Sequence, residues 1–133
     1  MQQATQFLDL NLKSCGSGQQ PLTRVAAQNC TAEPCNVRGG QLLLHFNATN
    51  LNQEETPIPV WASGQKNDGG NPFIYNTTCE TRTVNYPCSA QPGQQNLFGV
   101  FLLQVPESFG QGEADIQLHV GDIGCSAFRL NVP

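Results

Sequence analysis

The stretch Ala114-Asp-Ile-Gln-Leu-His-Val120 alternates apolar and polar residues along its whole length. Because successive side chains of a β-strand point to opposite faces of the sheet, this alternation predicts a strand with one buried face. The same period of two runs through residues 8–12, 42–47, 58–62 and 128–132, and more weakly through residues 22–27 and 72–76. Short strands separated by glycine and proline turns, with no helical repeat, predict an all-β sandwich or barrel.

Two stretches depart from this period. The segment Leu97-Phe-Gly-Val-Phe-Leu-Leu-Gln-Val105 is apolar on both faces. It is interpreted either as a central strand whose outer face a loop covers, or as a strand with one face lining an apolar cavity. Residues 64–72 are polar and rich in glycine, which predicts a loop.

Length and charge limit the class of protein. A chain of 133 residues is expected to form one domain, covering residues 1–133. Six Lys and Arg residues stand against ten Asp and Glu residues, so the chain has no basic surface for nucleic acid. The longest apolar run, residues 97–103, has the length of a strand and is too short to span a membrane, so we expect a soluble chain.

The cysteine count indicates a compartment. Six cysteines form an even set that predicts three disulfides, although six allow 15 pairings and spacing alone does not select one. Zinc ligands typically come in closely spaced pairs, a pattern that this set does not follow, so no metal and no cofactor are expected. The six residues are Cys15, Cys30, Cys35, Cys79, Cys88 and Cys125.

Three acceptor triplets for N-glycosylation begin at Asn29, Asn47 and Asn76. Together with the predicted disulfides they indicate the secretory route, and hence a secreted, extracellular or lysosomal lumenal protein. Residues 1–14 lack the uninterrupted apolar region of a signal peptide, so we expect a mature chain with an added start methionine.

Several short motifs occur in one order along the chain: Cys15-Gly-Ser after an alternating segment, Asn29-Cys30-Thr-Ala-Glu-Pro-Cys35, Arg38-Gly-Gly before Phe46-Asn-Ala-Thr49, Pro87-Cys88, and a lone Cys125 in the last strand. Over residues 7–132 this order resembles the ML (MD-two-related lipid-recognition) family, which includes the Niemann–Pick type C-two sterol carriers and their arthropod relatives. The resemblance implies an immunoglobulin-like two-sheet β-sandwich with three disulfides and a lipid between the sheets. It also implies the pairs Cys15–Cys125, Cys30–Cys35 and Cys79–Cys88.

The same resemblance implies where the ligand binds. It places Phe73, Val105, Pro106 and Phe109 at the mouth of the cavity. If Val105 points inward, the period of two turns Phe101 and Leu103 inward as well, and Tyr75 belongs to the same segment as Phe73. The alternative, in which Phe73 and Phe109 are core residues, stays open. These segments contain no Lys or Arg, which favours a lipid with a neutral head, or an acid whose head stays at the mouth.

Catalysis has little support in the sequence. His45 and His119 lie on the polar faces of predicted strands, and nothing places either beside a nucleophile and a carboxylate. We therefore expect a non-enzymatic monomer that carries a small hydrophobic ligand, such as a sterol or fatty acid, for transport or signalling, with transient membrane or acceptor-protein contact. The alternatives are an immune-recognition module that binds microbial lipid or a protein partner, and a secreted hydrolase.

Overall fold

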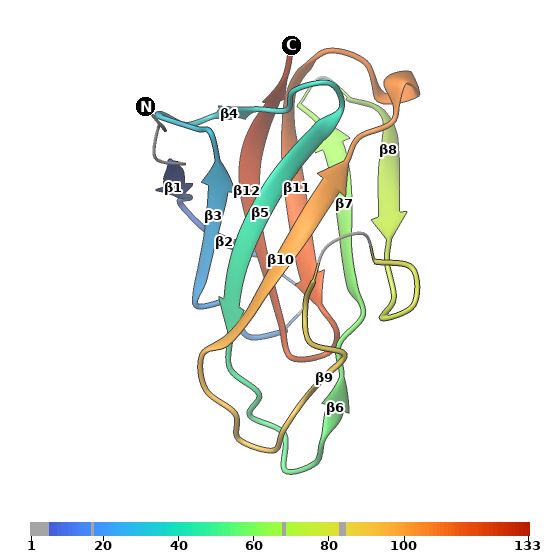
Figure 1. Cartoon of the computed structure of the whole chain (residues 1–133). Coiled ribbons are helices and arrows are strands. Elements are labelled where there is room, and N and C mark those ends of the chain that lie inside the picture. Colours follow the sequence, from blue (N-terminus) through green and yellow to red (C-terminus); the bar gives the residue numbers. More distant parts are fainter. Residues whose placement is uncertain (1–5, 17, 68, 83–84) are drawn as a thin grey trace.

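The computed structural model describes residues 6–16, 18–67, 69–82 and 85–133, and its strands form two facing sheets (Figure 1). The four-stranded sheet has the order β1-β3-β5-β10, formed by Phe7–Asp9, Arg24–Gln28, Gln41–Ala48 and Leu97–Gln104. The larger sheet has the order β2-β12-β11-β7-β8, formed by Lys13–Ser14, Gly124–Val132, Gly112–Val120, Val60–Lys66 and Gly69–Asn76. The predicted all-β sandwich is confirmed.

Three short elements complete this arrangement. Strand β4 (Cys35–Asn36) pairs with β12 in parallel and extends the larger sheet. Strands β6 (Thr56–Pro57) and β9 (Ser89–Ala90) pair with each other at one end of the sandwich. A 3-10 helix, η1 (Glu107–Phe109), lies between β10 and β11 at the opposite end (Figure 1).

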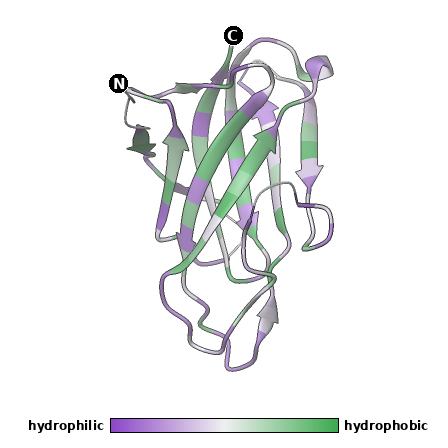
Figure 2. Cartoon of the chain, viewed as in Figure 1, coloured by the Kyte–Doolittle hydropathy of each residue, from purple (hydrophilic) through white to green (hydrophobic). Residues whose placement is uncertain are grey.

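Strand β11 shows why the sequence folds this way. It pairs with β12 on one side and with β7 on the other, and its alternating Ala114, Ile116 and Leu118 are fully buried between the sheets. On the facing sheet, Leu44 and Phe46 of β5 are buried in the same way. Figure 2 shows hydrophobic residues gathered along the strands and hydrophilic residues in the connecting loops. Burial of these two apolar faces against each other is the main stabilising term.

The strand predicted at residues 8–12 ends at Asp9, and a second short strand begins just after that segment, at Lys13. Leu8 of β1 pairs with Ala27 in the four-stranded sheet, whereas Ser14 of β2 pairs with Ser126 in the larger sheet. Between them the chain crosses from one sheet to the other, and Leu10 is buried at the crossing. The alternation reports the burial of Leu10 but carries no information about which sheet each residue joins.

The prediction of a central strand at residues 97–105 is wrong. Among the described residues, strand β10 pairs with β5 alone and forms an edge of the four-stranded sheet. Its inward residues are buried, but Phe98 on the outer face is 47% exposed, so no loop covers that face at this position. Along the free edge, the Val100 N–H donates to the Asn85 carbonyl, 3.0 Å away.

The predicted loop at residues 64–72 is also wrong for most of its length. Strand β7 runs to Lys66 and β8 begins at Gly69, with these two residues paired across a tight hairpin. Strand β8 is the edge of the larger sheet, and an edge tolerates the exposed Asn71 and Pro72 because part of its backbone needs no partner strand. Polar composition therefore indicated an exposed segment and not a loop.

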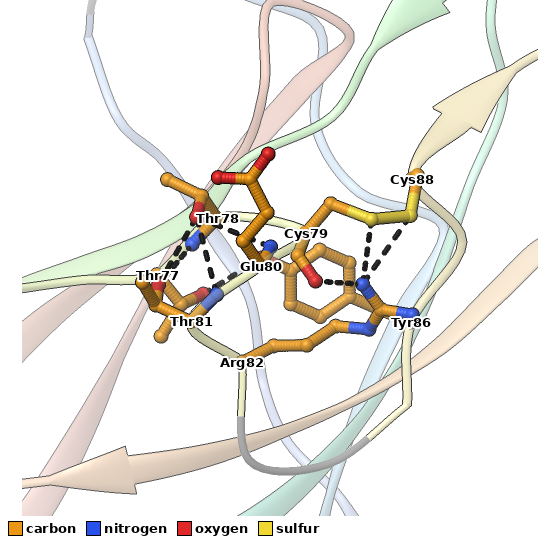
Figure 3. Close-up of a disulfide and its surroundings, with 8 residues drawn as sticks. All are labelled: Thr77, Thr78, Cys79, Glu80, Thr81, Arg82, Tyr86 and Cys88. Atoms are coloured by element: carbon orange, nitrogen blue, oxygen red, sulfur yellow. Dashed lines mark hydrogen bonds between the residues drawn. A yellow bond between two sulfur atoms is a disulfide. The ribbon is translucent and has the colours of Figure 1, made fainter.

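All three disulfides join the predicted pairs, Cys15–Cys125, Cys30–Cys35 and Cys79–Cys88. The first ties β12 to the segment after β2, and the second closes a short loop between β3 and β4. The third lies in the connection between β8 and β9 (Figure 3). There the Arg82 guanidinium Nη1 donates to the Cys79 carbonyl and lies against both sulfur atoms, with its Cζ 5.5 Å from the centre of the Tyr86 ring.

A threonine network begins this connection (Figure 3). The buried Thr77 hydroxyl donates to the Val60 carbonyl at 2.6 Å and lies 2.9 Å from the Tyr86 hydroxyl. The Thr81 hydroxyl accepts a hydrogen bond from the Thr78 backbone N–H at 2.8 Å. These bonds hold the chain directly after β8 against β7.

Candidate functional site

A cavity of about 840 Å³ opens at the end of the sandwich where β10 ends. Its walls come from both sheets and from the β10–β11 connection. The lining residues are Val37, Gly39, Gly40, Gln41, Ile74, Tyr75, Gln104, Val105, Pro106, Glu107, Gly110, Gln111, Val132 and Pro133. This volume lies within the usual range of small-molecule sites in proteins, about 300 to 1,000 Å³.

One wall is fixed by a close approach between Gly40 and Val105. The Val105 N–H donates to the Gly40 carbonyl at 2.8 Å, and a side chain at position 40 would lie 3.1 Å from the Val105 carbonyl oxygen. Gly40 also has φ of +76°, a conformation that only glycine adopts without strain. The glycine after Arg38 and Gly39 therefore holds Val105 against the turn before β5.

The facing wall comes from the edge strand β8. Ile74 is 65% exposed at the rim, and the half-buried Tyr75 lies on the cavity wall. The Tyr75 ring packs against Phe101 of β10, with the ring centroids 5.7 Å apart. This pair joins the edge of one sheet to the edge of the other behind the cavity.

Buried aromatic side chains near the cavity belong to the core and are not part of its wall. Phe73 and Phe109 meet edge to face, with centroids 4.8 Å apart and ring planes at 78°. Gly64 leaves room for this packing, because a methyl group there would overlap the Phe73 ring. The Lys66 ammonium lies 5.6 Å from the centre of the Phe109 ring, a cation–π contact that holds η1 to the larger sheet.

The structure divides the seven predicted ligand-binding residues into two groups. Tyr75, Val105 and Pro106 lie on the cavity wall. The other four are buried in the core and are not part of the wall: Phe73, Phe101, Leu103 and Phe109. Contact between any of the seven and a ligand stays a prediction.

The sequence did not point to Gln41, Gln104 or Val132 as lining residues. Gln41 and Gln104 pair with each other where β5 meets β10, so both reach the same end of the sheet. That register follows only from knowing that residues 41 and 104 lie in neighbouring strands. The Gly39-Gly40 turn was the available sign that Gln41 lies near the rim, because a turn next to a strand marks the end of that strand.

The cavity wall is almost without charge. Glu107 is the only Asp, Glu, Lys, Arg or His among the described residues that line it, and its side chain is exposed. No Lys or Arg belongs to this wall. Such a surface can hold an apolar molecule, and its polar amides from Gln41 and Gln104 can hydrogen-bond a hydroxyl or ester group.

Both histidines lie away from this cavity and pack on aromatic rings. His45 stacks on Phe7 with ring centroids 4.0 Å apart, and His119 stacks on Trp61 at 3.6 Å with nearly parallel planes. Burial lowers the pKa of His119 below its ordinary value, and burial together with Arg24 lowers that of His45. Trp61 lies on the outer face of the larger sheet, because its neighbours Val60 and Ala62 are buried.

A second hollow, of about 740 Å³, lies on the outer face of the larger sheet. Its side chains are mainly polar and include Lys13, Ser63, Asp115, Gln117 and Arg129. Asp115 and Arg129 form an exposed ion pair across it, with Nε and Oδ1 3.3 Å apart. This hollow does not suit an apolar ligand, because the ligand would displace water from groups that need it.

The described residues contain neither a candidate metal site nor a candidate membrane-spanning helix. No three His, Cys, Asp or Glu side chains there come together in a way that could hold a metal ion. None of the helical structure there is long and apolar enough to cross a membrane.

Comparison with solved structures identifies the fold. The chain superposes on a Niemann-Pick type C2 protein from the Japanese carpenter ant with a TM-score of 0.64, over 92% of this chain and 99% of that one, at 11% sequence identity. A weaker match, a Pseudomonas fluorescens alkylpurine DNA glycosylase bound to DNA, has a TM-score of 0.46 and 14% identity over 93% of this chain and 30% of that one. No protein-family model and no curated protein matches the chain. The fold is thus the immunoglobulin-like sandwich expected from the sequence, similar to that of a Niemann-Pick type C2 protein.

Proposed function

We propose that this chain is a secreted, non-enzymatic carrier that binds one small apolar lipid at the open end of its sandwich. The observation that carries the proposal is the cavity between the ends of the two sheets, whose lining, among the described residues, includes no Lys or Arg. The likeness in fold to a Niemann-Pick type C2 protein supports it. The ligand class is a sterol, fatty alcohol, ester or fatty acid.

The wall favours a ligand with a neutral head. Among the described residues no Lys or Arg lines the cavity, although a side chain at Gly110 would lie 2.9 Å from the Lys66 Nζ. A carboxylate buried at the wall away from Gly110 would lack a cationic partner, and burying an unpaired charge is costly. Gln41 and Gln104 offer amide groups to a hydroxyl or ester oxygen at the rim instead. A fatty acid fits if its carboxylate remains in water at the mouth, beside the exposed Ile74 and Pro106.

The Tyr75–Phe101 pair suggests how a longer ligand enters. The tail of a sterol or acyl chain would follow the gap between β8 and β10, where Tyr75 and Phe101 now meet. Because both strands are sheet edges, they can separate without loss of a strand pairing on that side. Access to the core then depends on the movement of these rings.

Fluorescent probes test the proposal. The parent protein is titrated with cis-parinaric acid and with dehydroergosterol, each at low and high salt. We expect saturable binding of at least one probe, unaffected by salt because no ion pair forms. Binding that needs low salt, or binding of neither probe, would contradict the proposal.

Val105→Asp provides the matching variant, because it places a charge on the wall of the cavity. We expect it to abolish probe binding. Val100→Asp is the control: it puts the same side chain on the same edge of the sandwich, but on the outer face of β10. If both variants fold and bind the probes equally well, the ligand site is elsewhere.

The remaining features follow from the same proposal. The carrier is a single domain over residues 1–133, works as a monomer in an extracellular or lysosomal compartment, and releases its ligand to a membrane or acceptor protein. The three disulfides suit such a compartment. A recognition module for microbial lipid would also bind at this cavity, but would favour anionic glycolipids in a salt-sensitive way.

A further inference from the structure

Two of the three glycosylation triplets share a structural feature. Asn47 of β5 is the direct register partner of Phe98 in β10, and Asn76 of β8 is the direct partner of Trp61 in β7. Directly opposed residues of an antiparallel pair point to the same face, with Cβ atoms about 4.5 to 5.5 Å apart. Each asparagine therefore stands beside an aromatic ring.

Both pairs lie on outer faces of the sandwich. The neighbours of Asn47 and Phe98 in the register, Ala48 and Leu97, are buried, which turns the first two outward. The same holds for Asn76 and Trp61, whose neighbours Tyr75 and Ala62 point toward the other sheet.

Each aromatic ring is also backed by a histidine. The His45 ring packs edge to face with Phe98, with centroids 5.2 Å apart, and His119 stacks on Trp61 at 3.6 Å. This packing holds the rings in place on the sheet surface. Phe98 nonetheless remains 47% exposed, next to the half-buried Val100 and Leu102 on the same face. An apolar surface of this kind on a free sheet face needs a cover.

We infer that Asn47 and Asn76 carry N-glycans, and that the first N-acetylglucosamine of each packs on the neighbouring aromatic ring, Phe98 or Trp61. A pyranose ring presents C–H groups that can lie on an aromatic face while its hydroxyls remain in water. Aromatic side chains at protein surfaces commonly serve contacts of this kind, in which one part is apolar and the other is hydrated. The inference needs the secretory route proposed above, but not the ligand.

The chemistry is a glycosyl transfer from a lipid-linked diphosphate oligosaccharide. The bond between the sugar C1 and the diphosphate oxygen breaks, C1 bonds to the asparagine Nδ2, the lipid diphosphate leaves, and one amide proton passes to a base of the transferase. The third residue of the Asn76 triplet, Thr78, has an exposed side chain whose hydroxyl also lies 3.1 Å from the Thr81 hydroxyl (Figure 3). Asn29, by contrast, lies in a left-handed turn after β3, and the next residue, Cys30, is in a disulfide.

The first experiment measures occupancy. The full chain is secreted from eukaryotic cells that keep their N-glycans in the high-mannose form, and glycopeptides are mapped by mass spectrometry. We expect sugar on both Asn47 and Asn76. Absence of sugar at either position would overturn the inference for that pair, whatever the lipid experiments show.

The second experiment measures contact, using Trp61 as the only tryptophan of the chain. Asn76→Gln should shift Trp61 emission to the red and increase its quenching by acrylamide. Trimming the parent with endoglycosidase H, which leaves one N-acetylglucosamine, should change neither. Asn47→Gln is the matched control and should leave Trp61 unaffected. Unchanged quenching in Asn76→Gln would show that the sugar does not cover the ring.

A double-mutant cycle examines the other pair. Asn47→Gln should lower the Tm of the glycosylated parent by about 2 to 4 °C, and should have no such effect in a Phe98→Ala background. Equal effects in both backgrounds would contradict contact between the sugar and Phe98. Concentration-dependent dimers of the fully glycosylated parent would show that a second copy, and not the glycan, covers this face.

Discussion

The half-buried Tyr75 ring on the cavity wall packs against the buried Phe101 ring, with centroids 5.7 Å apart and ring planes tilted by 46°. This contact joins the proposed site to the core, because Tyr75 of β8 lies on the cavity wall and Phe101 of β10 is buried. The two residues should therefore respond differently to truncation, although they touch.

Truncation on the two sides of this contact separates binding from stability. Phe101 is 1% exposed, so Phe101→Ala should lower the free energy of unfolding by about 3 to 5 kcal/mol. Tyr75→Ala should cost clearly less, because part of its ring is already in water, yet it should weaken the binding of cis-parinaric acid. Urea unfolding of both variants without ligand, followed by probe titration, makes the comparison. Equal stability losses would place Tyr75 in the core instead of on a ligand wall.

The Phe73–Phe109 pair decides between the two interpretations that the sequence left open. Both rings are buried, so Phe109→Ala should destabilise the ligand-free protein by about 3 to 5 kcal/mol. A double-mutant cycle with Phe73→Ala should give a coupling of about 0.5 to 1.5 kcal/mol, the usual range for an edge-to-face pair. Loss of probe binding with less than about 1 kcal/mol of destabilisation would mean that Phe109 contacts the ligand and not the core.

Alternation in residues such as Ile116 and Leu118 predicted an all-β sandwich or barrel and the buried faces of its strands, because it records burial directly. The family resemblance selected the sandwich. The sequence did not reveal the sheet edges. Residues 97–105 read as a central strand because Phe98, Val100 and Leu102 are apolar, whereas the structure leaves their outer face uncovered by a strand. An apolar residue type indicates that the side chain favours removal from water. It does not say whether a neighbouring strand, a loop or another group covers that side chain.

The cavity wall was also predicted only in part from the sequence. Val105 and Pro106 reach the cavity because the chain leaves β10 there, and their place at its mouth was implied by the family resemblance. Phe73 and Phe101 have the residue type expected of a cavity wall but are packed in the core. Cavities and cores use the same side chains, and only three-dimensional packing distinguishes them.

The disulfides should contribute more to stability the longer the loop they close, with a logarithmic dependence on its length. Cys15 and Cys125 are 110 residues apart, and chain-entropy models give such a bond about 4 to 5 kcal/mol, against about 2 kcal/mol for Cys30–Cys35 with a separation of five. Replacing Cys15 and Cys125 by serine should therefore lower the urea midpoint more than replacing Cys30 and Cys35. The reverse order would show that strain or burial, and not loop length, dominates.

Stability should fall as the solution is acidified through the histidine range. Burial lowers the pKa of His119 in the folded protein below its ordinary value of 6.5, so the unfolded chain binds a proton that the folded protein resists. The stabilisation is present above pH 6.5 and is lost as pH falls from there through the lowered pKa.

Urea unfolding between about pH 5.5 and 7.5 measures this loss in a range where carboxylates stay ionised. His119→Phe should flatten the profile more than His45→Phe, because His119 is the more deeply buried ring. Emission from Trp61, which stacks on His119, should follow the same titration in the folded protein. A profile that is unchanged in His119→Phe would assign the loss to other groups.

The central claim, that the cavity holds an apolar lipid, is tested most directly by extracting what the protein carries. The parent and Val105→Asp are secreted from the same eukaryotic cells, purified without detergent, extracted with organic solvent, and the lipids are quantified by mass spectrometry. We predict one neutral lipid class in near-stoichiometric amount from the parent and its loss from the variant. Extracts without lipid from both, or the same lipids in the same amounts from both, would contradict the account.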